Sequence, residues 1–205
     1  MLKGLIRAKV WIVILMVGIA SIAFGVRGIM ENNREPIDIS ECNWAELKVG
    51  DHIQGNIDVL FPAYAQTVNK ASVTGEYYAL PHVVNDGQMY TIDDFIGIYV
   101  RCDSAPAEPY NGLAEASVTW WTTDAQEIGY DSIYIDGIIK EMPKEFPDYF
   151  SDYLADMGYD SGYIGNTHYK LAIYPAEKNT TLLIAIGAAA TLAGLGGIIF
   201  NIRKR

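Results

Sequence analysis

Two long apolar runs dominate the hydrophobic pattern, one near each end of the sequence. The C-terminal run, residues 181–202, has no charged side chain and is followed by Arg203, Lys204 and Arg205. A helix rises about 1.5 Å per residue and the hydrocarbon core of a bilayer is about 30 Å thick, so roughly 20 apolar residues cross it. The run therefore predicts a transmembrane helix, and the residues before it are expected to be attached to a membrane.

The N-terminal run, residues 10–26, follows a basic start formed by Lys3, Arg7 and Lys9. It has two interpretations. A basic start, an apolar stretch and the small residues at 21–23 are typical of a cleaved signal peptide. The apolar run is longer than the core of such a peptide, which favours an uncleaved anchor helix. Cleavage would leave one span with the same domain outside.

Between the two runs the pattern is typical of β-strands. Residues 51–61 alternate, with Ile53, Gly55 and Ile57 on one face and polar side chains on the other. Further strands are predicted over residues 76–84, 94–101, 132–140 and 169–174. Gly55, Gly97 and Gly137 lie inside predicted strands, where glycine indicates a bulge or a close crossing in a tightly curved sheet.

One amphipathic helix is predicted over residues 144–157. Its apolar side chains, at positions 146, 150, 154 and 157, recur at helical spacing. Pro147 suits a first helical turn, and Gly158 suits the residue after the end. Residues 103–130 remain ambiguous, because good helix formers at 113–116 precede strand-favouring residues at 118–122.

These elements predict an α+β protein in which two transmembrane helices flank a small domain. We expect that domain to be a curved, mostly antiparallel β-sheet or an OB-like barrel, with one amphipathic helix. The predicted organisation is a basic N-terminus over residues 1–9, a first span over 10–28, a β-rich extracytoplasmic domain over 29–180, a second span over 181–202 and a basic tail over 203–205.

The charge distribution predicts the orientation of the chain in the membrane. The net charge is −10, the residues flanking the two spans carry three positive charges at each end, and the part between them is therefore strongly acidic. Basic flanks stay in the cytoplasm, so both termini are expected inside a cell membrane and the domain outside it. An acidic domain is repelled by anionic lipid headgroups and by nucleic acid, so neither is an expected partner.

No motif for catalysis or cofactor binding is present. The three histidines, His52, His82 and His168, show no metal-ligand spacing, and the nucleophile, phosphate-loop and dinucleotide-binding patterns are missing from the sequence. We therefore expect neither an enzyme nor a cofactor. The remaining catalytic hypothesis is a membrane-anchored hydrolase or thiol enzyme built on Cys102 or His82, which requires these side chains to meet in one pocket.

Two further residue groups carry hypotheses about sites. A row of aspartates on the predicted helix leads into a faintly calcium-loop-like segment, with Asp148, Asp152, Asp156 and Asp160 as candidate cation ligands. The simpler interpretation is a solvated helix face, since the ligand order of an EF-hand is missing. Cys42 and Cys102 either form a disulfide, whose loop of roughly 60 residues would contribute about 4 kcal/mol, or remain two thiols.

Small residues line one side of each predicted span. They are Gly18, Ser21 and Gly25 in the first span, and Ala190, Gly194 and Gly197 in the second. Such spacing allows helices to approach closely. The two spans are therefore expected to pack on each other or to pair across a homodimer.

The layout of a span, a β-rich domain with the GDHIQG and DFIGIYVR segments, a second span and a basic tail resembles uncharacterised two-span bacterial membrane proteins of the domain-of-unknown-function kind. More loosely, it is similar to OB-like domains held between two spans. The resemblance implies a place in the bilayer but assigns no functional residue. The expected function is a module that binds another membrane or envelope protein, with ligand or divalent-cation sensing as the alternative.

Overall fold

The computed structural model describes residues 2–85, 87, 89–102, 107–123, 127–176 and 179–203. The chain divides into two compact units. Residues 1–34 and 177–205 form a helical unit, and residues 35–176 form a β-rich unit. These bounds lie within a few residues of the predicted division between spans and domain.

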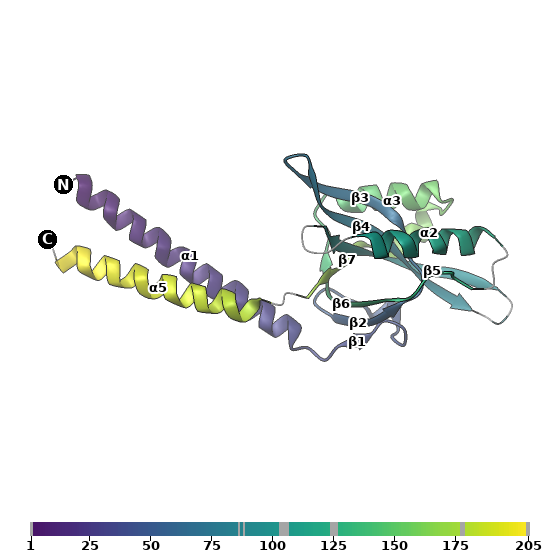
Figure 1. The fold of residues 1–205 in the computed structure, drawn as a ribbon, viewed down its shortest axis with the longest axis horizontal. Coiled ribbons are helices and arrows are strands. Elements are labelled where there is room, and N and C mark those ends of the chain that lie inside the picture. Colours follow the sequence, from purple (N-terminus) through teal and green to yellow (C-terminus); the bar gives the residue numbers. More distant parts are fainter. Residues whose placement is uncertain are drawn as a thin grey trace. The chain divides into compact units, whose positions relative to one another are not determined.

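The helical unit consists of α1 (Leu2–Asn32) and α5 (Thr180–Arg203), which run antiparallel and side by side (Figure 1). The apolar segments are Lys9–Asn32 of α1 and all of α5. Each has 24 residues, with mean hydropathies of 2.3 and 2.2, and is long and apolar enough to cross a membrane. Helix α1 ends at Asn32, beyond residue 28 where the first span is predicted to end. An ion pair of 2.7 Å joins Arg27 and Glu31 in this last part of the helix.

Glycines let the two helices pack backbone against backbone. A Cβ atom added at Gly187 would lie 2.8 Å from the Gly18 carbonyl oxygen, and one added at Gly194 would lie 2.8 Å from the Leu15 nitrogen. Such distances leave no room for a larger side chain. Gly18 and Gly194, two of the small residues predicted to mediate helix packing, therefore lie where the two apolar helices of one chain meet.

The β-rich unit contains one seven-stranded mixed sheet with the order β1-β2-β6-β7-β5-β4-β3. Its strands are β1 (Ile37–Asp38), β2 (His52–Ile57), β3 (Phe61–Asn69), β4 (Ser72–Asn85), β5 (Tyr90–Arg101), β6 (Ile133–Glu141) and β7 (His168–Pro175). The β1–β2 and β5–β7 pairs are parallel and the other pairs are antiparallel. The sheet is not closed, since β1 and β3 are its edges, so the barrel alternative does not describe this arrangement.

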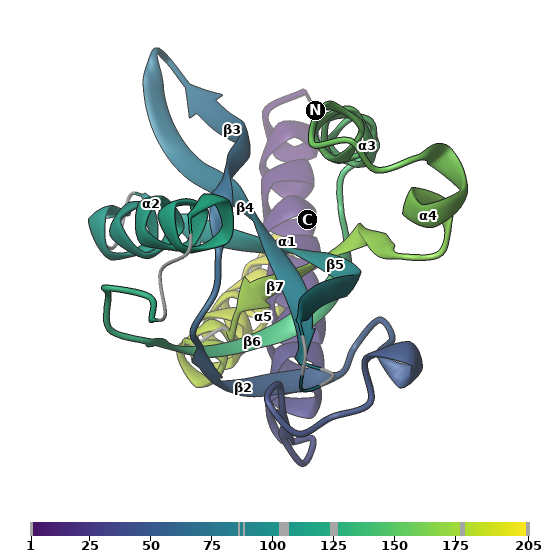
Figure 2. The same ribbon diagram turned by 90° about the vertical axis from the view of Figure 1, so that its right-hand side faces the viewer.

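Hydrophobic side chains fill both faces of the sheet, with helices covering each (Figure 2). In β4, Tyr78 and Leu80 point into one core and Tyr77 and Ala79 into the other. The helices are η1 (Trp44–Glu46), α2 (Glu108–Thr122), α3 (Phe146–Asp156) and α4 (Ser161–Gly165). Helix α2 and η1 belong to the first core, and α3 and α4 to the second.

Four of the predicted strands are present as β4, β5, β6 and β7, with ends that differ by a few residues. The strand predicted over 51–61 is instead two elements, because β2 ends at Ile57 and β3 begins at Phe61. Within the ambiguous stretch, Glu108–Thr122 form helix α2, whose Leu113, Ala114 and Ser117 are buried against the sheet. Burial on one helical face thus overrides the strand preference of residues 118–122.

The predicted amphipathic helix is present as α3. Phe150 and Leu154 are fully buried, whereas Met157 at the end of the stripe is 37% exposed. Pro147 lies in the first turn, and Gly158 follows the helix with φ +98°, a conformation that suits glycine.

Candidate functional site

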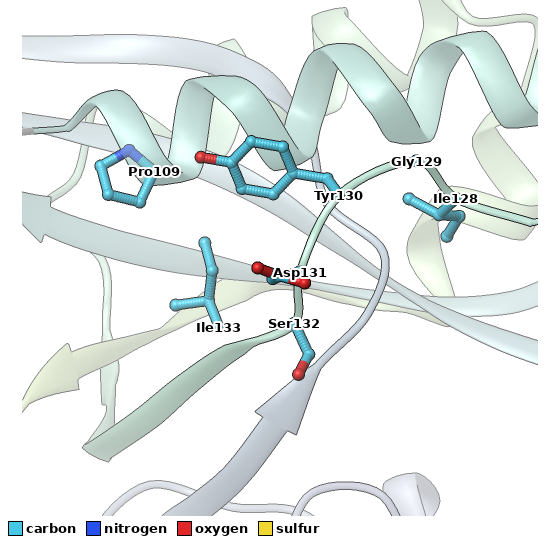
Figure 3. A pocket seen from close by; sticks show the side chains of 7 residues that line it. All are labelled: Pro109, Ile128, Gly129, Tyr130, Asp131, Ser132 and Ile133. Carbon is cyan, nitrogen blue, oxygen red and sulfur yellow. The ribbon is translucent and has the colours of Figure 1, made fainter.

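A hollow of about 620 Å³ lies on the β-rich unit, between the start of α2 and the loop that leads into β6 (Figure 3). Its lining consists of Pro109, Ile128, Gly129, Tyr130, Asp131, Ser132 and Ile133. The Tyr130 ring packs on Gly112, where an added Cβ atom would lie 2.6 Å from the ring carbon Cζ. The Tyr130 hydroxyl points toward Pro109.

The polar side chains of this hollow are one phenol, one carboxylate and one hydroxyl. Its lining contains no histidine, cysteine or lysine, so no base or activated nucleophile stands beside Asp131 or Ser132 within it. Most of the lining residues are exposed. The phenol, the carboxylate and the hydroxyl offer hydrogen bonds to a polar group in the hollow.

Every histidine of the chain is hydrogen-bonded to an aspartate. The ring nitrogen and the carboxylate oxygen are 2.6–2.7 Å apart in the pairs His52–Asp136, His82–Asp93 and His168–Asp94. Short bonds of this kind are strong when the imidazole is charged. Among the residues that the structure describes, no group of three or more His, Cys, Asp and Glu side chains could hold a metal ion.

Asp94 is the carboxylate at the centre of the most enclosed pair. It accepts hydrogen bonds from the His168 ring at 2.6 Å and from the His168 backbone N–H at 2.8 Å. The bond to Asp94, above all, raises the pKa of His168 from its ordinary value, against the opposing effect of burial.

Another histidine, His82, contacts η1. The His82 ring stacks on Trp44, with centroids 4.7 Å apart and planes inclined by 20°. His82 belongs to β4 and Trp44 follows β1, which is the opposite edge region of the sheet. This contact bridges two elements that are distant in the strand order.

The candidate cation ligands do not converge. Asp148, Asp152 and Asp156 lie along the exposed side of α3. Asp160 caps α4 instead, accepting hydrogen bonds of 2.8 Å from the Gly162 N–H and 2.9 Å from the Tyr163 N–H. A calcium site needs six or more converging oxygens, so the geometry favours a solvated helix face.

No disulfide joins Cys42 and Cys102 in the structure. Cys102 donates its backbone N–H to Thr74, at one end of the β4–β5 hairpin. His82 lies eight residues further along β4, about 26 Å away at 3.3 Å per residue, so Cys102 and His82 do not share a pocket. Burial raises the pKa of the Cys42 thiol, which lowers its reactivity.

Residues 2–203 match the family described as Domain of unknown function (DUF8577). The chain belongs to the DUF8577 family. The match spans α1, the β-rich unit and α5, so all three are parts of one family unit. No curated protein matches the chain. The expected likeness to proteins with a domain of unknown function between two apolar helices is confirmed at this level.

The aspartate partners of the histidines are the residues that the sequence analysis of this DUF8577 protein missed. His168 and Asp94 are 74 positions apart, and His52 and Asp136 are 84 apart. Their meeting depends on the β2–β6 and β5–β7 pairings, which cross over other elements. The only local signal was Asp93-Asp94, an acidic pair placed within a strand.

Proposed function

We propose that this DUF8577 protein is anchored in the cell membrane by α1 and α5, and that its β-rich unit binds another membrane or envelope protein outside the cytoplasm. The observation that carries the membrane assignment is the surface of the helix pair. Large apolar side chains such as Phe24 and Leu192 are 67% and 71% exposed even though the helices pack on each other. A surface of this kind suits lipid, whereas in water it would aggregate.

The two ends of the β-rich unit lie close together, as expected of a domain inserted between two neighbouring helices. Ile37 of β1 is in register with Ile53, Ile53 with Gly137, and Gly137 with Pro175 of β7. The first and last strands therefore begin and end on one lateral row, about 14 Å apart at 4.8 Å per strand. A domain with adjacent ends can be inserted into a helical hairpin without separating its helices.

The orientation follows from the basic residues. Lys3, Arg7 and Lys9 precede the first span, and Arg203–Arg205 follow the second, which favours a cytoplasmic location for both. The acidic unit then lies outside. Its charge makes nucleic acid an unfavourable partner and leaves a protein surface with basic groups as the complementary one.

Exposed aromatic side chains support binding as the activity. Tyr134, Tyr149 and Tyr90 are 59%, 51% and 51% exposed, and tyrosine is enriched in protein interfaces. The histidine–aspartate pairs, in contrast, connect strands and lie outside the hollow at Tyr130. Contact surface is thus better supported than an active centre.

The test of the orientation uses the two native thiols. Intact cells producing the full chain are treated with a membrane-impermeant maleimide, with and without prior reduction, and compared with Cys42→Ser, Cys102→Ser and cysteine-free variants. We expect Cys102 to be labelled in intact cells, and Cys42 more slowly because its pKa is raised. Labelling that needs permeabilised cells would place the β-rich unit in the cytoplasm. Labelling that needs reduction would show that the thiols pair in the cell.

The test of binding uses photo-crosslinking in the same cells. A photoreactive amino acid replaces Tyr134 on β6 or Tyr149 on α3, whose exposed side chains belong to different elements. We expect a discrete adduct of the same partner in repeated preparations from one of these positions. Adducts from neither position, at normal expression and membrane insertion, would contradict binding through these surfaces.

A further inference from the structure

The hairpin between β3 and β4 ends in an exposed apolar tip that projects beyond the neighbouring strands (Figure 2). We call residues 68–73 the hairpin tip. Val68 and Val73 are paired directly across the two strands, so both side chains lie on the same face. They are 62% and 40% exposed. An apolar pair presented in this way gains free energy from contact with an apolar surface.

The turn of the hairpin tip has a defined conformation. Lys70 and Ala71 have φ +47° and +70°, in the left-handed region that residues other than glycine rarely adopt. Two successive positive φ angles are typical of the tight turns that match the twist of a hairpin. Behind the turn, the hydroxyl oxygens of Thr67 and Thr74 are 3.1 Å apart, and the Thr74 hydroxyl donates to the Thr67 carbonyl at 3.2 Å. The paired strands therefore hold the two valines at the end of the hairpin.

The charge of this hairpin differs from that of the rest of the β-rich unit. Residues 59–75 contain no aspartate or glutamate, and the hairpin tip carries one charge, on Lys70. The next acidic residue, Glu76, accepts hydrogen bonds from the Gln66 amide and the Tyr78 hydroxyl. The repulsion that an acidic domain meets at anionic lipid headgroups is therefore weakest at the hairpin tip.

The strand directions place the hairpin tip at the end of the sheet where β7 leaves it. β4 is antiparallel to β5, and β5 is parallel to β7, so the start of β4 and the end of β7 lie at one end. Gly75 pairs with Arg101, and Ile98 pairs with Ile173. These registers put Gly75 about one residue beyond the row of Pro175. The turn lies four residues farther on, so the hairpin tip reaches roughly 16 Å past Pro175 at about 3.3 Å per residue.

The connection from β7 to α5 has a similar reach. β7 ends at Pro175 and α5 begins at Thr180, five residues later. Five residues span at most about 18 Å when fully extended. If α5 crosses a membrane, this end of the sheet is therefore held about as close to the bilayer as the hairpin extends.

Building on the proposed membrane anchoring, we propose that the hairpin tip is a second contact with the bilayer, made with phospholipid. Val68 and Val73 enter the boundary between headgroups and acyl chains, where apolar side chains are removed from water. Lys70 reaches the lipid phosphates with its ammonium group while its stem lies along apolar surface. The contact would orient the β-rich unit on the membrane that α5 enters.

Fluorescence quenching by lipid tests the contact. The full chain without its native cysteines is labelled with an environment-sensitive dye at Ser72→Cys, Tyr90→Cys or Leu192→Cys, and placed in vesicles of phosphatidylcholine and phosphatidylglycerol. Ser72 is an exposed residue of the hairpin tip. Tyr90 is exposed at the start of β5, eleven residues and about 36 Å from the end at Arg101. We expect a nitroxide on the lipid headgroup to remove most of the fluorescence at Ser72 and little at Tyr90.

The label on α5 separates the two proposals. Leu192 is exposed on α5, so a nitroxide on the acyl chain should quench its label if the helix crosses the bilayer. Quenching at Leu192 without quenching at Ser72 would overturn the hairpin contact alone. No quenching at Leu192 would overturn the membrane anchoring on which the contact rests. Protection of the Ser72 label from aqueous iodide without quenching by lipid would mean that a second copy of the chain covers the hairpin tip, which also overturns the lipid contact.

A double variant assigns the contact to the two valines. Val68→Thr combined with Val73→Thr keeps the branched shape that suits a strand but replaces one methyl group of each side chain by a hydroxyl. We expect this variant to recover most of the fluorescence of the Ser72 label. The matched control is Val49→Thr, at an exposed valine in the chain before β2, which should leave the quenching unchanged. Equal quenching in the double variant and the control would contradict insertion of the valines.

Discussion

Ser117 has a hydroxyl that serves two backbone groups in the core. It donates to the Leu113 carbonyl at 2.7 Å and accepts from the Leu60 N–H at 3.0 Å, and the residue is completely buried. Ser117→Ala would leave the Leu60 N–H without this acceptor, away from water. We expect a loss of about 1–3 kcal/mol in the free energy of unfolding.

The matched control is Thr119→Ala. Thr119 makes the same bond to the residue four positions earlier, Glu115, at 2.9 Å, but it lies on the exposed side of α2. Its removal should change stability by less than about 0.5 kcal/mol. Denaturant unfolding of the full chain in one detergent measures both variants. Equal losses would mean that the bond between Ser117 and Leu60 contributes nothing particular.

Single residues could be assigned from the sequence where a local pattern constrained them. Phe150 and Leu154 follow helical spacing. Gly158 could be placed after the helix because a helix often ends in a residue with positive φ, which glycine adopts without strain. The bond between His168 and Asp94 could not, because it depends on strand pairing over 74 positions. Local spacing carries no information about which distant polar groups meet.

At the scale of elements, the packing of α1 on α5 depends on which glycine is replaced. A Cβ atom at Gly194 would lie 2.8 Å from the Leu15 nitrogen, whereas one at Gly196 would have no atom within 4 Å. Gly194→Ala should therefore weaken helix association by about 1–3 kcal/mol, as in other overpacked sites. Gly196→Ala should leave it unchanged or slightly stronger, because alanine favours helix.

Spin labels at Phe24 and Ile186 can report this association, since both side chains are exposed. In a cysteine-free background, the distance between the labels is followed while SDS is added to the micelles. The labels should separate at lower SDS in Gly194→Ala than in Gly196→Ala. Separation at the same concentration in both would show that the close backbone contact is not what joins the helices.

The boundary between β2 and β3 was not predicted, because the tertiary contacts of the two strands determine it. The strand β3 follows β2 after only three residues, so one alternating pattern ran across both strands. In β4 and β5, by contrast, the apolar residues are nearly continuous because helices cover both faces of the sheet. The strands of a half-buried barrel have one apolar face each. The nearly continuous apolar runs of β4 and β5 therefore argue against a barrel.

At the scale of the whole molecule, the division into an apolar helix pair and an acidic β-rich unit was readable from hydropathy and charge. The strand order was not, since it depends on crossovers that place β7 between β5 and β6. The edge strand β3 contains Pro62 and three register shifts in its pairing with β4. Proline and bulges at an edge oppose pairing with another strand, so partners are better sought on side-chain surfaces.

Charge repulsion gives the last prediction. The β-rich unit, residues 35–176, contains 23 acidic and 6 basic side chains. Salt shortens the screening length from about 10 Å at 0.1 M to about 3 Å at 1 M, so repulsion in the folded state should weaken. We expect the melting temperature of the full chain in one detergent to rise by several degrees between low and high NaCl.

A calcium titration at matched ionic strength separates general screening from a specific site. Because Asp148, Asp152 and Asp156 lie in a row along exposed α3 and Asp160 caps α4, Ca²⁺ should act only as Mg²⁺ does at equal concentration. A larger shift with Ca²⁺, abolished by Asp152→Asn, would instead favour cation sensing.

A melting temperature that falls with NaCl would show that attractive ion pairs outweigh the repulsion. The sign of the change in melting temperature with NaCl therefore decides whether the excess of acidic side chains destabilises the folded state or is compensated there by attractive ion pairs.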